Sequence, residues 1–103
     1  MSAPAVVLGV DVGSTATKVV AVAASGAIVG GAERGYPTRT TEPGEAVQDP
    51  VALREAALDA VTRCAETCAA AGRDVAGLAF SGALHSLLGL DRAGEPVTPV
   101  YSW

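Results

Sequence analysis

The sequence has few basic residues, and the ones it has are scattered. Only 7 of its 103 residues are lysine or arginine, against 11 acidic residues, and the formal net charge is -4. A surface that binds nucleic acid or an anionic membrane needs clustered positive charge, which this chain lacks. We therefore expect no nucleic acid and no membrane among its partners.

The chain also lacks a long hydrophobic run and a disulfide framework. Its first apolar stretch has no lysine or arginine before it and stops at Asp11, which fits neither a secretory signal nor a membrane span. Cys64 and Cys68 are the only cysteines, and their spacing on a predicted helix is typical of reduced packing residues. A metal pair would need two further ligands. These features predict a cytoplasmic protein.

Hydrophobic residues make up 50% of the chain, so a packed core is expected. Short apolar runs predict strands, and the first three of them follow one another as an antiparallel unit. A turn at Ser25-Gly26 and the segment DRAGEP provide the tight connections, the second one within a hairpin. The predicted strands, with both arms of that hairpin, span residues 5–10, 18–24, 27–35, 75–81, 85–90 and 97–103.

One helix is predicted between the third and fourth strands, after an irregular connection at residues 36–50. Asp49 can cap the first turn, Pro50 suits the first helical position, and Gly72 can end the helix. The order strand, strand, strand, helix, strand and hairpin predicts an α/β fold with a mixed sheet. The side chains expected to face that sheet are Ala57, Leu58, Val61, Cys64, Ala65 and Cys68.

A polar bend separates the first two strands, in the stretch GVDVGSTATKVV at positions 9–20. Backbone N–H groups in such a bend cannot all pair within a strand ladder, and small residues let an anion approach them closely. Hydroxyl groups and a lysine add further donors. The residues of this predicted phosphate-binding bend are Gly13, Ser14, Thr15, Thr17 and Lys18.

Asp11 stands at the end of the first strand, where a buried carboxylate without a partner would be costly. A hydrated Mg²⁺ ion beside phosphate oxygens would be such a partner, because this ion prefers one or two carboxylates plus water. Magnesium together with phosphate predicts a nucleotide. Alternatively, Asp11 caps or staples a hairpin, and Lys18 is a solvated charge at a strand end.

Two common nucleotide motifs are excluded by their spacing. A Walker loop needs glycine directly before its lysine, where this chain has Thr17. The dinucleotide fingerprint needs a third glycine that opens a helix, whereas this chain continues as a valine-rich strand.

Three segments of the sequence resemble the FGGY family of carbohydrate kinases. GVDVGSTATKVVAV resembles the first phosphate motif of the superfamily that contains sugar kinases, heat-shock chaperones and actin. YPTRTTEPGEAVQDP resembles the connection before the first helix in the family, and LAFSGALHSLLGLDRAGEPVTPVYSW resembles the strand and hairpin of its gluconate kinases. The resemblance implies a ribonuclease H-like (actin-like ATPase) N-terminal domain. It also implies that residues 1–103 are an incomplete part of that domain, without the C-terminal nucleotide-binding domain.

The same resemblance implies ATP-dependent phosphorylation of a sugar or sugar acid, with gluconate converted to 6-phosphogluconate. Asp11 would lie beside the magnesium, and the bend would face the ATP phosphates. Leu84, His85 and Trp103 occupy positions where the family contacts its sugar, although relatives often have methionine at the first of these. Relatives often have glutamate where this chain has Val47. The general base is expected beyond Trp103, so residues 1–103 alone are expected to be inactive.

Other interpretations stay open at this point. The opening motif also resembles ATPase activators of 2-hydroxyacyl-CoA dehydratases, and sister FGGY kinases act on xylulose or related ketoses. An interaction module that has lost the reaction would keep the same fold. His85 can also be an ordinary surface or core group, and Trp103 a core side chain. No oligomeric state is predicted.

Overall fold

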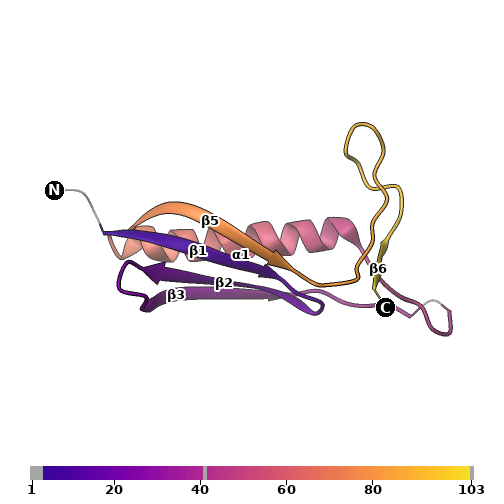
Figure 1. Ribbon diagram of the computed structural model, residues 1–103, viewed down its shortest axis with the longest axis horizontal. Helices are drawn as coiled ribbons and strands as arrows, with labels where there is room; N and C mark the ends of the chain where they lie inside the picture. The colour runs from indigo at the N-terminus through magenta and orange to yellow at the C-terminus, as the bar shows by residue number, and fades with distance from the viewer. Residues whose placement is uncertain (1–3, 41, 103) are drawn as a thin grey trace.

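The computed structural model describes residues 4–40 and 42–102. A four-stranded sheet in the order β3-β2-β1-β5 has one long helix on one face, and a two-stranded sheet lies at its far end (Figure 1). The elements are β1 (Ala5–Val12), β2 (Ala16–Ala23), β3 (Ile28–Gly35), β4 (Ala46–Gln48), α1 (Pro50–Ala70), β5 (Asp74–Gly82) and β6 (Val100–Ser102).

The central sheet confirms the predicted mixed arrangement. β1 is antiparallel to β2 and parallel to β5, and β2 is antiparallel to β3. β1 extends two residues further than predicted and β2 begins two residues earlier, because Asp11 pairs with Lys18 and Val12 with Thr17 across the ladder. The predicted bend therefore shrinks to residues 13–15, which we name the β1–β2 loop.

Side chains of β1 alternate between the two faces of the sheet, as strand geometry requires. Val6, Leu8 and Val10 are at most 2% exposed and belong to the core under α1. Val7 and Asp11 lie on the opposite face and are exposed. This alternation places the Asp11 carboxylate on the face of the sheet that the helix does not cover.

The predicted helix ends are confirmed. Asp49 is the N-cap, and its Oδ1 accepts a hydrogen bond from the Val51 N–H at 3.0 Å. Gly72 lies one residue past the C-cap with a φ of 73°, in the left-handed region that favours glycine. The N–H groups of Gly72 and Arg73 donate to carbonyls in the last turn, at 3.0 and 2.9 Å. This closing arrangement satisfies carbonyls that the helix itself leaves unpaired.

The buried face of α1 agrees with the prediction in part. Ala56, Ala60, Cys64 and Cys68 form a stripe at intervals of four residues, whereas Leu58 is 60% exposed. Small side chains let the helix approach the sheet, and a Cβ added at Gly30 would lie only 3.9 Å from the Cys68 sulfur. The expectation that Leu58 faces the sheet was wrong, whereas Cys64 and Cys68 are buried in the core and Val61 and Ala65 pack against it, as predicted.

The connection before the helix contains a strand that was predicted as irregular. β4 pairs antiparallel with β6, and its Gln48 is opposite Val100. Arg39 and Val47 also form an isolated bridge, with both backbone hydrogen bonds at 2.8 Å. A strand of three residues carries almost no periodic signal, and its partner lies more than fifty positions away.

The predicted hairpin at residues 85–103 is formed only in part. The turn is present, since Asp91 Oδ1 accepts the N–H groups of Ala93 and Glu95 at 2.8 and 2.9 Å. Its first arm is not a strand and touches the second arm through isolated bridges at Leu87 and Leu90. The molecule is elongated, with extents of 56 × 28 × 19 Å. The segment between β5 and β6, which we name the projecting arm, extends from one end of it (Figure 1).

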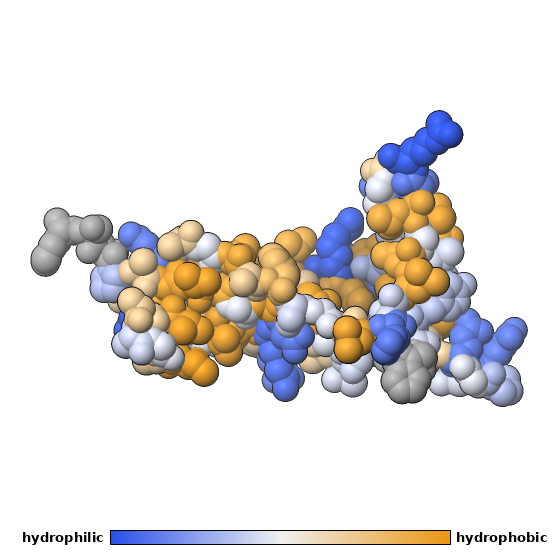
Figure 2. Space-filling model, in the orientation of Figure 1, coloured by the Kyte–Doolittle hydropathy of each residue, from blue (hydrophilic) through white to orange (hydrophobic). Residues whose placement is uncertain are grey.

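Several large apolar side chains are exposed. Figure 2 shows hydrophobic residues gathered over the strands and along the projecting arm. Within the described residues β5 has a strand partner on one side only, and its Leu78 and Phe80 are 48% and 66% exposed. Contiguous exposed apolar side chains are typical of surfaces that another protein segment covers. In the part of the chain that the structure describes, no helix is long and apolar enough to cross a membrane.

Both cysteines are expected to be unreactive in the native protein. Cys64 and Cys68 are 0% and 2% exposed, and burial raises the pKa of the Cys64 thiol, with further contributions from Cys68. A raised pKa leaves less of the reactive thiolate at any pH below it. In a colorimetric thiol titration of the full-length protein at pH 8, we expect these two to react only after denaturant is added. Equal labelling rates with and without denaturant would contradict this burial.

Candidate functional site

Three polar side chains meet on the exposed face of the sheet, one from each of three neighbouring strands. Asp11 of β1 is paired with Lys18 of β2 on one side and with Ser81 of β5 on the other. The Ser81 hydroxyl donates to Asp11 Oδ1 at 3.0 Å. All three line an open cavity of about 380 Å³, whose walls also include Val20 and Phe80. The structure thus brings together Asp11 and Lys18, which were predicted, and Ser81, which was not.

The second oxygen of Asp11 faces the β1–β2 loop. A Cβ added at Gly13 would lie 3.8 Å from Asp11 Oδ2 and only 3.0 Å from the Ala16 carbonyl oxygen. Any larger residue at Gly13 would therefore occupy the space between the carboxylate and the loop. The 3.0 Å approach to the Ala16 carbonyl is shorter than an ordinary contact, which favours glycine at this position.

The donor set at Asp11 fits a magnesium ion held with phosphate. A carboxylate oxygen is the hard ligand that Mg²⁺ prefers, and this ion commonly keeps several waters and substrate oxygens. Among the described residues no cluster of three or more His, Cys, Asp or Glu side chains is present. A metal at Asp11 would therefore take most of its ligands from water and from a bound phosphate.

The β1–β2 loop presents backbone N–H groups to solvent. Its ends are joined by a hydrogen bond from the Gly13 N–H to the Ala16 carbonyl at 3.0 Å. Ser14 and Thr15 are exposed, and their N–H groups have no hydrogen-bond partner among residues 4–40 and 42–102. Exposed N–H groups in a tight loop beside a lysine can bind an anion.

Two buried side chains support this loop from the other side. The Tyr36 hydroxyl donates to the Gly13 carbonyl, and Gln48 Nε2 donates to the Ser14 carbonyl at 2.6 Å. Burial raises the pKa of the Tyr36 phenol above its usual value of 10.0, so the hydroxyl stays protonated at neutral pH. Sequence reasoning missed both residues because they lie 23 and 34 positions from the carbonyls that they bind.

Thr17 lies elsewhere than predicted. It alternates to the core face of β2, is 0% exposed, and lies beside the Tyr36 phenol under the loop. Its hydroxyl is therefore not available to a phosphate in this structure. Lys18, the next residue, is exposed on the opposite face. The one-residue alternation of a strand separates these two neighbours.

The predicted sugar-contacting residues follow directly after β5. The Ala83 N–H donates to the Val12 carbonyl at 2.9 Å, which places the start of this segment at the end of β1. Leu84 is 78% exposed, and His85 has a φ of 64°, the one positive value among the described residues other than glycine. Such a backbone conformation is often associated with functional sites. Trp103 lies outside the described residues.

A small cavity of about 190 Å³ joins this segment to the β1–β2 loop. Gly13 lines it from the loop, Gly82 and Ser86 line it from either side of Leu84 and His85, and Gln48 lines it from β4. The phosphate and sugar regions that the sequence predicts are therefore adjacent at the same end of the sheet. Residues of β1, β4 and β5 all reach this end.

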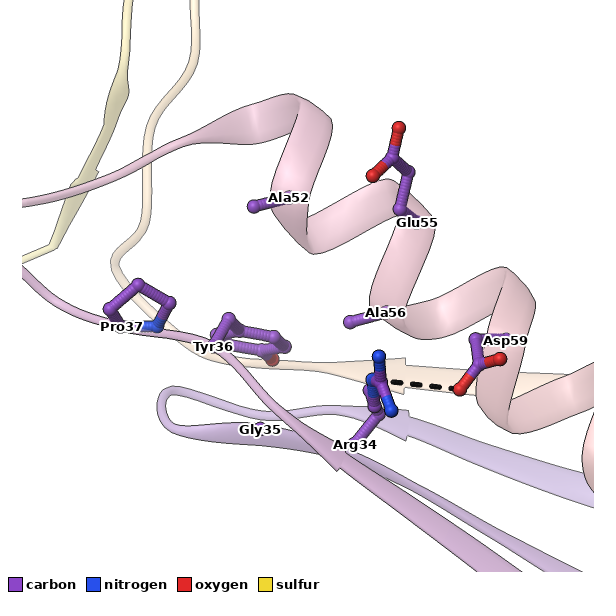
Figure 3. A pocket seen from close by; sticks show the side chains of 8 residues that line it. All are labelled: Arg34, Gly35, Tyr36, Pro37, Ala52, Glu55, Ala56 and Asp59. Carbon is purple, nitrogen blue, oxygen red and sulfur yellow. Dashed lines mark ion pairs between the residues drawn. The ribbon is translucent and has the colours of Figure 1, made fainter.

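A separate pocket of about 430 Å³ lies between the end of β3 and the first turns of α1. Figure 3 shows Arg34 reaching toward Asp59, while Ala52 and Ala56 face Tyr36 across the pocket. The closest distance in the Arg34–Asp59 ion pair is 3.6 Å, and Asp59 also binds Arg63, at 3.1 Å. These partly exposed pairs stabilise the fold by at most about 1 kcal/mol. The Arg34–Asp59 pair links the end of β3 to the helix, whereas the Arg63–Asp59 pair lies within α1.

Comparison with known proteins assigns the family. The N-terminal domain of the FGGY family of carbohydrate kinases matches residues 6–103. The chain belongs to this family. The FGGY carbohydrate kinases are phosphotransferases, and the predicted actin-like ATPase fold of an incomplete N-terminal domain is confirmed.

Individual relatives give the same assignment. The gluconokinase of Bacillus subtilis (strain 168) is 31% identical over 96 residues, which are 93% of this chain and 18% of the relative. A xylulose kinase of Staphylococcus xylosus is 31% identical and covers 96% of this chain and 20% of its own length. The crystal structure of gluconate kinase from Lactobacillus acidophilus matches with a TM-score of 0.81 and 32% identity, covering 97% of this chain and 20% of that one. The chain thus spans about a fifth of these FGGY kinases.

The family assignment does not agree with an ATPase activator that carries an iron–sulfur cluster. Cys64 and Cys68 are buried between α1 and the sheet of this FGGY segment. The cysteine pair packs the core, as the sequence predicted.

Proposed function

We propose that the full-length protein carrying this segment transfers a phosphoryl group from ATP to gluconate and releases 6-phosphogluconate. The observation that carries the proposal is the placement of Asp11 between Lys18 and Ser81, with its second oxygen toward Gly13. The similarity to the Bacillus subtilis gluconokinase supports the choice of acceptor.

In this proposal the segment stabilises the phosphate end of ATP. Phosphoryl transfer is accelerated mainly by positioning and by neutralising charge on the phosphate oxygens. Magnesium, when bound at Asp11, supplies positive charge to those oxygens. The N–H groups of Ser14 and Thr15 donate hydrogen bonds to them, and Lys18 adds a further positive charge. Asp11 and Lys18 stand opposite each other on β1 and β2, and the loop that joins these strands carries the N–H groups, so their backbone is in place before the reaction begins.

The acceptor is held by the segment after β5. His85 can donate or accept a hydrogen bond at a sugar hydroxyl, and Leu84 offers an apolar contact to the carbon chain. We propose Trp103, which lies outside the described residues, as a further sugar contact. The base that removes the hydroxyl proton lies beyond residue 103, so the segment alone is expected to show no kinase activity.

A second candidate acceptor is xylulose or a related ketose. Its support is the xylulose kinase of Staphylococcus xylosus, which is as similar to this chain as the Bacillus gluconokinase, at 31% identity. The two candidates share the phosphate site and differ only in the sugar.

A sugar panel tests the proposed acceptor. Full-length protein is given MgATP with gluconate, xylulose, glycerol or no sugar, and ADP release and the phosphorylated sugar are both measured. We expect kcat/KM for gluconate to exceed that for xylulose at least tenfold, because a site built to hydrogen-bond one acceptor rejects analogues strongly. The reverse preference would favour the ketose. ATP hydrolysis that no sugar stimulates would contradict both.

A further inference from the structure

The carbonyl groups of the β1–β2 loop are all held from one side. The Gly13 carbonyl accepts the Tyr36 hydroxyl, and the Ser14 carbonyl accepts Gln48 Nε2 at 2.6 Å. The Thr15 carbonyl accepts the backbone N–H of Tyr36 at 3.1 Å. Three consecutive carbonyls of the loop are thus tied to the connection between β3 and α1.

This anchoring determines where the N–H groups of the loop point. In a trans peptide the C=O of one residue and the N–H of the next point in opposite directions, and the described residues contain no cis bond. Holding the Gly13 carbonyl therefore turns the Ser14 N–H outward, and holding the Ser14 carbonyl does the same for the Thr15 N–H. These are the two N–H groups of the loop that have no partner among the described residues.

We propose that Tyr36 and Gln48 are positioning residues that orient the loop N–H groups toward the phosphates of a nucleotide. The inference rests on the proposed function, since it assigns the loop to ATP. Neither side chain touches the nucleotide; each acts through the carbonyl that it binds.

Both side chains suit a fixed support. Tyr36 is 8% exposed and Gln48 is 3% exposed, so neither hydrogen bond competes freely with water. Gln48 Nε2 also donates to Thr38 Oγ1 at 2.9 Å, which holds the amide group in place. A loop without this support would sample conformations in which its N–H groups face elsewhere, and each such conformation lowers the apparent affinity for phosphate.

The test uses Tyr36→Phe and Gln48→Met in the full-length protein, which remove a donor and keep the side-chain bulk. We expect each to raise KM for MgATP three- to tenfold, the effect of one hydrogen bond, and we expect Tyr36→Phe, which does not line the cavity beside the sugar segment, to leave KM for the sugar unchanged. Amide hydrogen exchange at Ser14 and Thr15 should also lose the protection that MgATP gives in the unmodified protein. Tyr101→Phe is the matched control, because it removes the hydroxyl of a partly exposed tyrosine on β6. It should change neither the KM for MgATP nor the exchange protection of the loop.

A milder variant tests the same support with less risk of misfolding. Thr38 is exposed, so Thr38→Val should fold normally while it releases the Gln48 amide, and it should raise KM for MgATP in the same direction but less. If Tyr36→Phe and Gln48→Met keep the original KM and exchange protection, the positioning role is overturned. For Tyr36→Phe, a rise in both KM values together would indicate general damage to the fold and would also overturn it.

The two proposals fail in different ways. If the unmodified protein phosphorylates no sugar but MgATP still protects the loop, and Tyr36→Phe removes that protection, the positioning role stands and the sugar kinase assignment fails. If MgATP leaves exchange at Ser14 and Thr15 unchanged in the unmodified protein, the loop does not bind phosphate and the positioning role fails.

Discussion

Replacing Asp11 with alanine should lower kcat of the full-length protein at least a hundredfold. The change removes the carboxylate whose Oδ2 faces the β1–β2 loop, and with it the residue proposed to hold magnesium at the phosphates. Loss of a single preorganised charge-stabilising group typically costs about a hundred- to a thousandfold in kcat. The measurement is the initial rate of sugar phosphorylation at saturating ATP, over a range of Mg²⁺ concentrations.

Two further variants make the Asp11 experiment specific. Asp74→Asn removes an exposed carboxylate from the other end of β5 and should leave the rate unchanged. Ser81→Ala deletes the hydroxyl that orients Asp11 Oδ1 and should give a smaller loss, with a raised Mg²⁺ requirement. If Asp11→Ala kept the original rate and the original Mg²⁺ dependence, the proposed metal site would be wrong.

Replacing Leu8 with alanine should destabilise the protein by about 2–5 kcal/mol, the usual cost of emptying a fully buried leucine site. Leu8 is 0% exposed and lies in the middle of β1, where the strand meets α1. A rigid sheet under a closely packed helix has little freedom to collapse into the cavity. The measurement is the urea midpoint of the unfolding transition, followed by circular dichroism.

Val7→Ala is the matched control for Leu8→Ala. The neighbouring side chain is on the same strand but is 46% exposed on the other face, so its truncation should cost well under half as much. Equal losses for the two variants would mean that the alternation of β1 between core and surface is not as described.

Local signals in the sequence were sufficient for most elements of the fold. The Ser25-Gly26 turn, the Asp49-Pro50 start and Gly72 after the helix each act within a few residues, and the structure has all three where the sequence placed them. β4 had no such signal, because three residues become a strand only through their pairing with β6. Leu58 was misplaced because its hydrophobicity favoured burial, whereas the buried stripe of α1 consists of the smaller side chains of Ala56, Ala60, Cys64 and Cys68.

Some residues of the candidate site could likewise be identified from local signals in the sequence, and others could not. Asp11 and Lys18 could be singled out because they stand next to one polar bend in an apolar strand pair. Ser81, Tyr36 and Gln48 could not, since each reaches the site from a distant part of the chain through tertiary contacts. In retrospect, strand alternation could have placed Thr17 in the core, because it differs from exposed Lys18 by a single position.

The hydrogen bond between Ser81 and Asp11 joins residues 70 positions apart, and this has a consequence for biosynthesis. A ribosome adds about 5–20 residues per second, so roughly 4–14 s separate the synthesis of the two side chains. During that interval the Asp11 carboxylate lacks the Ser81 hydroxyl as a hydrogen-bond donor. The hydrogen bond from Ser81 to Asp11 therefore forms only after β5 has emerged and joined the sheet.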